Sequence, residues 1–360
     1  MPHFTVVCPT WNRGKALRST VLSVLNQSDG DFQLVIASDA SSDDTDTVAQ
    51  QLAEQDSRIL FLRTRRYGFQ AGPINEALAL TDSACVAYID HDDLWHPDHL
   101  ATMRSLLEEA DVAATSSRKI DLTGRVLSSS DPISMLWHPE AQILSPLFEN
   151  SAAAHRRWLV DATGGWTESE IGLEDWDLWL RCTDAGARVA TTLNSTVDIL
   201  EAPTTRQNSL PLAFGHALAV FPDSRSARAA QRRLIDPRLI PVAFEACLED
   251  MVAWYSAARS ASTLVFPKGW KNTSQEFLRA SIEDHLRRVG THWQPLTIEK
   301  TEHGWVLAIP IGTMTEEHTQ RYQRTFAQRM PRQMEFFRDV LQGAKPLSAL
   351  VPQPAATVCT

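Results

Sequence analysis

The amino-acid sequence predicts an α/β fold with a mostly parallel sheet. Short β-rich runs alternate with segments of helical spacing through the first quarter of the chain, which is the pattern of strand-helix-strand units. Polar clusters directly follow several of these runs, as ligand-binding loops do in such sheets. A length of 360 residues favours two domains, since domains typically hold about 100–200 residues.

The expected elements can be assigned in chain order. The β-rich runs are 4–8, 33–37, 59–62 and 84–89, and helical spacing follows at 17–25, 47–55, 73–80 and 99–109, with a further strand near 112–115. The carboxyl ends of parallel strands meet at one edge of a sheet. We therefore expect the polar segments 10–13, 38–44 and 90–93 to lie along one rim.

The character of the chain changes beyond Pro203. Helical signals dominate at 226–234, 241–258, 274–289 and 316–341, with one hairpin expected over 296–309. We expect an α/β domain over 1–215, a mainly helical domain over 216–345 and a loose tail over 346–360. The mixed charge of the expected C-terminal helices is typical of solvated faces.

Charge and cysteine content exclude several classes of protein. There are 34 Lys and Arg against 44 Asp and Glu, a net charge of −10, so the basic excess of a nucleic-acid-binding protein is lacking. The five cysteines are scattered without a C-x-x-C pair, which argues against disulfides and structural zinc. No apolar run reaches the roughly 18 residues of a membrane span. We expect a cytoplasmic protein.

The acidic cluster Asp90-His91-Asp92-Asp93 follows the strand expected at 84–89. Three carboxylates so close together repel one another, and a divalent cation can offset that cost. Mg²⁺ and Mn²⁺ are typically bound by one or two carboxylates together with substrate phosphates. The cluster therefore predicts a site for Mn²⁺ or Mg²⁺ and a diphosphate, and the alternative is a solvated turn or helix cap.

Two further segments suggest a nucleoside. Trp11 could stack on a base and Arg13 could pair with a phosphate, while Asp39 could accept hydrogen bonds from a base or ribose. The alternatives are ordinary turn chemistry for Asp39 and a packed core position for Trp11.

In order and spacing, these segments resemble the inverting glycosyltransferases of family 2, which have the GT-A fold. The resemblance covers about residues 3–205. It rests on Val6 to Arg13, Leu22 to Gln27, Ser38 to Thr45, Asn75, Asp90 to Asp93, Gly164-Gly165-Trp166 and Glu174 to Arg181.

The resemblance implies roles for individual residues. The nucleotide would be bound by Pro9, Thr10, Trp11, Arg13, Asp39, Asp90 and Asp92. The metal would be bound by Asp92 and Asp93, with His216 as a candidate third ligand. The sugar or acceptor would be bound by Gly165, Trp166 and Trp176. Asp175, with Glu174 beside it, would be the catalytic base; the alternative for this pair is capping of a helix. Two departures are Ser38, where the family usually has Asp, and Ile74, where it often has Arg.

The expected activity is transfer of a hexosyl or N-acetylhexosaminyl group from a nucleotide sugar, with UDP favoured, to a soluble small-molecule, carrier-bound or glycan acceptor. Residues 1–215 would form the GT-A domain, and the helical domain over 216–345 would bind the acceptor or mediate a homodimer. A sugar-nucleotide pyrophosphorylase is the second enzymatic interpretation, although the glycine-rich loop it needs after the first strand is absent. An inactive nucleotide-sugar-binding module is the non-enzymatic one.

Overall fold

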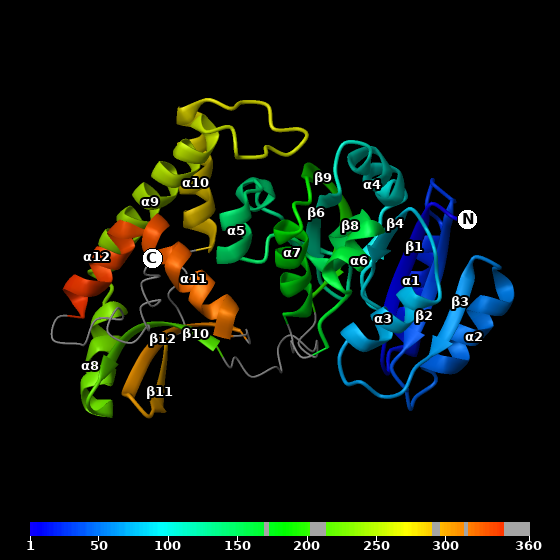
Figure 1. Cartoon of the computed structure of the whole chain (residues 1–360), viewed down its shortest axis with the longest axis horizontal. Helices are drawn as coiled ribbons and strands as arrows, with labels where there is room; N and C mark the ends of the chain where they lie inside the picture. Colours follow the sequence, from blue (N-terminus) through cyan, green and yellow to red (C-terminus); the bar gives the residue numbers. More distant parts are fainter. Residues whose placement is uncertain (169–172, 202–213, 290–295, 313–315, 342–360) are drawn as a thin grey trace, which may run out of the picture. The chain divides into compact units, whose positions relative to one another are not determined.

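A computed structural model describes residues 1–168, 173–201, 214–289, 296–312 and 316–341 (Figure 1). The chain forms two compact units, Met1–Leu210 with Ala258–Thr273, and Pro211–Ala257 with Ser274–Thr360. Residues 258–273, expected in the C-terminal domain, pack with the first unit, where Val265 and Lys268 form backbone bridges to Trp137 and Thr192. Among the described helices, none is both long and apolar enough to cross a membrane.

A nine-stranded sheet forms the centre of the first unit. Its main path has the order β3-β2-β1-β4-β8-β6-β9-β5, and β7 pairs with β6. The strands are β1 Phe4–Thr10, β2 Phe32–Ser38, β3 Ile59–Arg63, β4 Cys85–Tyr88, β5 Leu94–Trp95, β6 Val112–Ile120, β7 Val126–Ser129, β8 Ala153–Arg156 and β9 Val189–Leu200. The first four run parallel, as do β6 and β9, whereas β8 lies antiparallel between β4 and β6. The predicted α/β fold class is confirmed.

Helices cover both faces of this sheet. They are α1 Gly14–Leu25, α2 Thr45–Gln55, α3 Ala71–Ala79, α4 His99–Leu107, α5 Pro139–Leu144, α6 Trp158–Thr163 and α7 Glu174–Asp184. Val6 and Cys8 of β1 pack into a core with side chains of α1, α2 and α4. Val7 points the other way, into a core with side chains of α3, α6 and α7. This alternation along a buried strand fixes which helices lie on which face.

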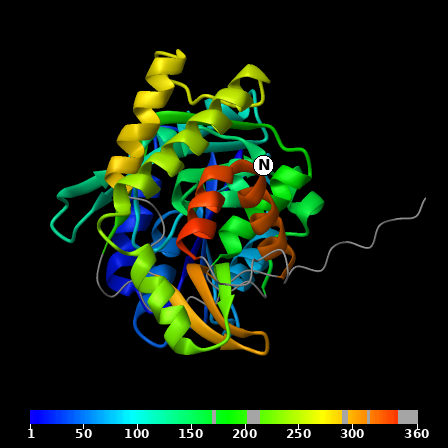
Figure 2. The same ribbon diagram turned by 90° about the vertical axis from the view of Figure 1, so that its left-hand side faces the viewer.

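The second unit is built on a three-stranded antiparallel sheet in the order β10-β12-β11. Its elements are β10 Phe214–Phe221, α8 Ser224–Leu234, α9 Ile240–Ser260, α10 Gln275–Val289, β11 Thr297–Thr301, β12 Gly304–Gly312, α11 Glu316–Arg329 and α12 Pro331–Val340. The helix expected over 316–341 is two helices, because Pro331 lacks the N–H that a helix interior needs. Helix α8 packs on the sheet (Figure 2), and strand β10 was not foreseen.

The Gly165-Trp166 turn is fixed by side chains of α3 and α7. The Asn75 amide donates to the Trp166 carbonyl (2.8 Å) and accepts from the Trp166 N–H (2.9 Å). Arg181, held by Asp177 one turn earlier on α7, donates to the Gly165 carbonyl (2.7 Å). These contacts hold the turn against both helices.

We predict that Gly165→Ala destabilises the protein more than Gly164→Ala. Both glycines have positive φ (80° and 75°), so each alanine costs about 1–2 kcal/mol of backbone strain. A Cβ on Gly165 would also lie 2.8 Å from the Asn75 Oδ1, while Gly164 has nothing within 4 Å. Loss of the Asn75 hydrogen bonds should add about 1–2 kcal/mol. Equal unfolding free energies of the two variants in urea titrations would contradict this role for Asn75.

Candidate functional site

Three polar segments lie at one edge of the sheet. Strands β1, β2 and β4 are parallel neighbours, and Thr10 at the end of β1 is paired with Ser38 at the end of β2. Backbone bonds extend the pairing past the strands: the Asp39 N–H donates to the Thr10 carbonyl (2.9 Å), and the Ile89 N–H donates to that of Val7 (3.0 Å). Segments 10–13, 38–44 and 90–93 therefore follow the same edge, as the order of elements predicted.

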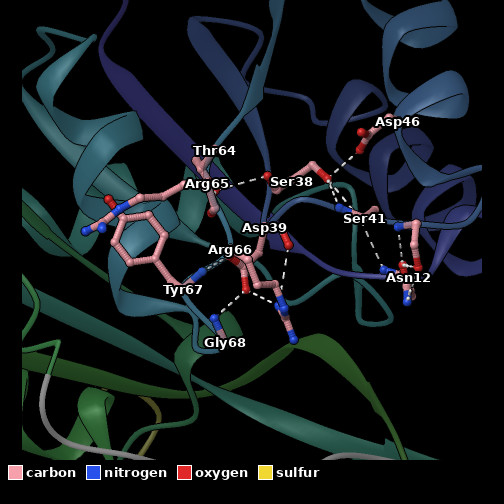
Figure 3. Close-up of polar contacts among 11 residues, drawn as sticks. Asn12, Ser38, Asp39, Ser41, Asp46, Thr64, Arg65, Arg66, Tyr67 and Gly68 are labelled. Carbon is pink, nitrogen blue, oxygen red and sulfur yellow. Dashed lines mark hydrogen bonds and ion pairs between the residues drawn. The ribbon is translucent and has the colours of Figure 1, made fainter.

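The turn after β1 is held by the loop after β2. Asn12 has a φ of 51°, a conformation that asparagine tolerates better than most residues. Its side-chain oxygen accepts from the Ser42 N–H (2.8 Å), and the Arg13 N–H donates to the Thr45 hydroxyl (2.8 Å). Figure 3 shows Asn12 beside this loop. The turn leaves the Trp11 side chain 44% exposed, in contrast to the packed core position that was its alternative.

Asp39 is the centre of a polar cluster on this edge (Figure 3). Its carboxylate is 4% exposed and accepts from the backbone N–H groups of Tyr67 (2.6 Å) and Gly68 (2.9 Å). Arg66 forms an ion pair with it, and the Arg66 guanidinium lies 3.9 Å from the centre of the Trp11 ring. The Arg66 guanidinium, a flat group with N–H donors, thus contacts both the Trp11 ring and the Asp39 carboxylate. A nucleobase is also flat and carries N–H donors, so the same ring and carboxylate suit a nucleobase.

Ser38, which departs from the family pattern, faces the protein interior. It is fully buried, and its hydroxyl donates to the Asp46 carboxylate (2.5 Å) and lies 2.9 Å from the Ser41 hydroxyl. Asp46 is also paired with Arg63. Ser38 therefore helps to hold the loop that carries Asp39.

Asp93 is bound on both oxygens by the protein. Its carboxylate is 4% exposed, accepts from the Ser151 hydroxyl (2.5 Å) and accepts from the Leu200 N–H (3.1 Å). Burial and the nearby Asp90 raise the pKa of Asp93 well above its ordinary value. These two contacts let Asp93 hold the backbone on either side of the acidic segment, and its expected metal ligation stays a prediction.

Asp90 and Asp92 remain as the available carboxylates of this segment. Asp90 accepts from the Asn150 amide (3.2 Å), and burial, with Asp92 as the next cause, raises its pKa to about 7. The Asp92 side chain is 19% exposed, and its carboxylate lies 3.9 Å from the His91 ring. Repulsion between two such carboxylates is a cost that a divalent cation relieves.

The donor set fits a metal held together with a diphosphate. Across the part of the chain that the structure describes, no three or more His, Cys, Asp or Glu residues are grouped so that they could hold an ion. One or two carboxylates with substrate phosphates and water is a common way of binding Mg²⁺, and Asp90 with Asp92 can supply those carboxylates. The side chain of His216, the predicted third ligand, lies outside the described residues, so that assignment stays a prediction.

Asp175 occupies the first turn of α7. Its pKa is raised to about 7, mainly by burial and in part by the neighbouring carboxylates of Glu174 and Glu149. A hydrogen bond from the Trp176 N–H (2.8 Å) acts in the opposite direction, because it favours the ionised form. Glu174 is 3% exposed. A carboxyl group with a pKa near neutrality can take up and release a proton in that pH range.

Trp166 and Trp176 do not offer a stacking surface to a sugar. Trp166 is 3% and Trp176 is 1% exposed. Trp166 packs edge-on against Tyr88, and the Trp176 indole donates to the Gln142 carbonyl (2.5 Å). Both rings belong to the packing around α7, the alternative to a sugar or acceptor platform at these two positions. Gly165 serves the turn described above.

Residues 149–151 are part of the site, although sequence reasoning did not find them. Asn150 and Ser151 bind Asp90 and Asp93, and the Ser151 hydroxyl also accepts from the Asp90 N–H (2.9 Å). They precede β8, which is antiparallel to β4, so its amino end meets the carboxyl end of β4. Sequence reasoning places ligand sites at the carboxyl ends of strands, whereas these residues lie at an amino end. The alternating pattern that marks a half-buried strand is missing from the Ala-rich β8.

Comparison with known proteins gives the class of the N-terminal part. Residues 5–154 match the family model described as glycosyl transferase family 2. The match agrees with the family resemblance found in the motifs.

The relatives are named glycosyltransferases. A GalNAc(5)-diNAcBac-PP-undecaprenol beta-1,3-glucosyltransferase of Campylobacter jejuni is 32% identical over 112 residues, which cover 30% of this chain and 36% of the relative. The putative teichuronic acid biosynthesis glycosyltransferase TuaG of Bacillus subtilis is 29% identical over 163 residues, 44% of this chain and 62% of TuaG. The matches thus span less than two thirds of either relative.

Two solved structures are similar over most of the chain at low identity. The mannosyltransferase PcManGT from Pyrobaculum calidifontis, in complex with GDP-Man and Mn²⁺, aligns with a TM-score of 0.48 and 16% identity, covering 97% of this chain and 78% of PcManGT. Residues 1–349 of TarS from S. aureus, in complex with UDP-GlcNAc, align with a TM-score of 0.49 and 16% identity, covering 86% and 98%.

We predict that Asp175→Asn changes how stability depends on pH. The folded-state pKa of Asp175 is about 7, against an ordinary value of 3.8, so between these pH values the folded chain holds a proton that the unfolded chain releases. Stability therefore falls as pH rises through this window. The unfolding free energy of the wild type, measured in urea at pH 5 and pH 8, should fall more than that of Asp175→Asn. Parallel losses would contradict the raised pKa.

Proposed function

We propose that this chain is an inverting, divalent-metal-dependent glycosyltransferase that uses a nucleotide sugar, with UDP as the favoured nucleotide. The observation that carries the proposal is the meeting of three groups at one end of the first unit. An aromatic and carboxylate pair, Trp11 with Asp39, lies on the same sheet edge as the carboxylates of Asp90 and Asp92. Asp175, whose pKa is near neutrality, is close enough to Asp90 to raise the pKa of that carboxyl.

The nucleoside would be held by the cluster around Asp39. A base stacking on Trp11 would take the place of the Arg66 guanidinium and donate an N–H to the Asp39 carboxylate. The buried hydroxyl of Thr10 has no hydrogen-bond partner among the described residues, so it is free to bind a polar group of the nucleotide. Pro9 and Arg13 flank this position on the same turn.

The metal would be held by Asp92, with Asp90 serving the ribose or the metal. Bound there, a divalent cation supplies charge neutralisation and Lewis acidity toward the departing diphosphate. Asp93 would act indirectly, because its bonds to Ser151 and Leu200 fix the backbone that presents Asp92. Asn150 would orient Asp90 in the same way.

Asp175 would act as the general base. The acceptor hydroxyl attacks the anomeric carbon and gives its proton to the Asp175 carboxylate, while the bond to the nucleoside diphosphate breaks on the opposite face. Attack from that side inverts the anomeric centre. The neighbouring Glu174 raises the pKa of Asp175 and so increases its basicity. We propose a soluble or carrier-bound acceptor.

We expect Asp92→Asn and Asp93→Asn to separate metal binding from folding. Thermal melts of the wild type with Mn²⁺ and a panel of nucleotide sugars should show a rise in Tm for the correct donor, since a ligand of the native state stabilises it by mass action. Asp92→Asn should keep the Tm of the unliganded protein and lose the metal-dependent rise. Asp93→Asn should lower the unliganded Tm, because it weakens a buried network.

The panel also tests the proposal as a whole. A wild type that no nucleotide sugar stabilises would exclude a donor site of this kind. Binding without transfer to any acceptor and without donor hydrolysis would favour the inactive binding module. Unchanged metal-dependent binding in Asp92→Asn would remove Asp92 from the metal site.

We expect Asp175→Asn to lower kcat by about two to four orders of magnitude, the usual contribution of a general base, and to leave the donor-dependent rise in Tm. For the wild type, kcat/KM should increase as pH rises through about 7, because the base must be ionised. Glu174→Gln removes a neighbouring negative charge and should move that increase to lower pH. A variant of Asp175 with near-normal kcat would assign the proton transfer to another group.

A further inference from the structure

Helix α8 carries a stripe of arginines in an otherwise acidic protein. The segment Ser224–Leu234 contains Arg225, Arg228, Arg232 and Arg233, here called the arginine stripe, and no acidic residue. Spacings of three and four residues place Arg225, Arg228 and Arg232 on one side of the helix. The opposite side, with Ala227, Ala230 and Leu234, is buried. All four arginines are exposed, so the stripe is turned away from the core.

The stripe is not neutralised within the described part of the chain. Arg228, Arg232 and Arg233 form no ion pair with a described residue, and Arg225 has only the nearby Asp223, which caps the helix. Other arginines of the same unit are paired on their own helices, as Arg288 is with Asp284 and Arg338 with Glu335.

Repulsion between like charges three and four residues apart destabilises a helix. An external anion would relieve that cost. Arg232 and Arg233 also line a groove together with Phe221, Pro222 and Ser226. The remaining carboxylate of this groove, Asp236, is held by Arg238 (2.5 Å).

Exposed aliphatic side chains follow the stripe directly in the chain. Ile235 is 41%, Ile240 49% and Val242 54% exposed. Single exposed aliphatic residues are common on protein surfaces, but three within eight residues, next to four exposed arginines, form a mixed basic and apolar segment. Such segments are typical of surfaces that contact lipid headgroups and the outer part of the acyl layer.

We propose that the segment from Arg225 to Val242 docks the protein on an anionic lipid surface. The guanidinium groups would pair with headgroup phosphates, and the aliphatic side chains would enter the interface. The net charge of −10 does not prevent this, because charges more than about 8 Å from the surface are largely screened at physiological ionic strength. The exposed aliphatic side chains favour a lipid surface over a nucleic acid, because the nucleic-acid backbone offers no apolar layer that they could enter. The proposal does not depend on the transferase activity.

Sedimentation of the full chain with vesicles tests it. We expect the protein to pellet with phosphatidylcholine vesicles that contain about one third phosphatidylglycerol, and not with pure phosphatidylcholine. Raising the salt concentration should weaken the binding. Arg228→Ala with Arg232→Ala should lower the partition coefficient roughly 20-fold, from the usual contribution of a basic residue at an anionic surface. Ile240→Ser with Val242→Ser should weaken binding at low and high salt alike.

A matched control separates the stripe from general charge. Arg288→Ala with Arg338→Ala removes the same two charges from paired arginines of the same unit and should leave vesicle binding unchanged. Equal losses in the two double variants, equal binding to neutral vesicles, or no binding by the wild type would overturn the proposal. Stronger, stripe-dependent binding to an oligonucleotide would also overturn it and assign the stripe to nucleic acid. Unchanged far-ultraviolet circular dichroism and Tm establish that each variant is folded.

Discussion

The site depends on one physical constraint, the burial of several carboxylates at the same end of a sheet. Burial raises the pKa values of Asp90 and Asp175 to about 7 and that of Asp93 well above its ordinary range, and each of these carboxylates is near another. Such a cluster persists only where hydrogen bonds compensate it. Ser151 and the Leu200 backbone do so for Asp93, and Asn150 does so in part for Asp90. The partial compensation at Asp90, beside the more accessible Asp92, is what leaves a role for a cation.

The surroundings of Asp175, the proposed base, depend on a second set of contacts within the protein. Asn75 on α3 and the Asp177–Arg181 pair on α7 fix the Gly165-Trp166 turn. Trp166 and Trp176 are packed side chains around α7. Asp175 therefore stands on a helix that is packed against the core of the first unit, and a rigid support of this kind is what positioning of a catalytic group requires.

Charge is distributed unevenly along the chain. The acidic residues at the sheet edge suit a cation and a diphosphate, whereas α8 has four arginines and no acid. The net charge of −10 conceals both features. The proposed lipid contact and the proposed transferase site stand on separate residues, so neither proposal depends on the other.

Local sequence predicted the parallel strands β1 to β4, the helices between them and the rim that follows β1, β2 and β4. Strand and helix periodicity encode these features directly, and parallel strands must share an edge. Other features depend on contacts between distant segments, which local sequence does not encode. The antiparallel β8 brings Asn150 and Ser151 to the rim, and Ser151 and the Leu200 backbone bind Asp93. The burial of Trp166 and Trp176 is likewise set by the tertiary packing.

The segment 258–273 likewise shows no local sign that it packs with the first unit. By itself, the sequence determined the fold class and the family resemblance of residues 5–154. Only the tertiary structure decided which carboxylates remain available to a ligand, because burial and hydrogen-bond partners are set by residues far away in the chain.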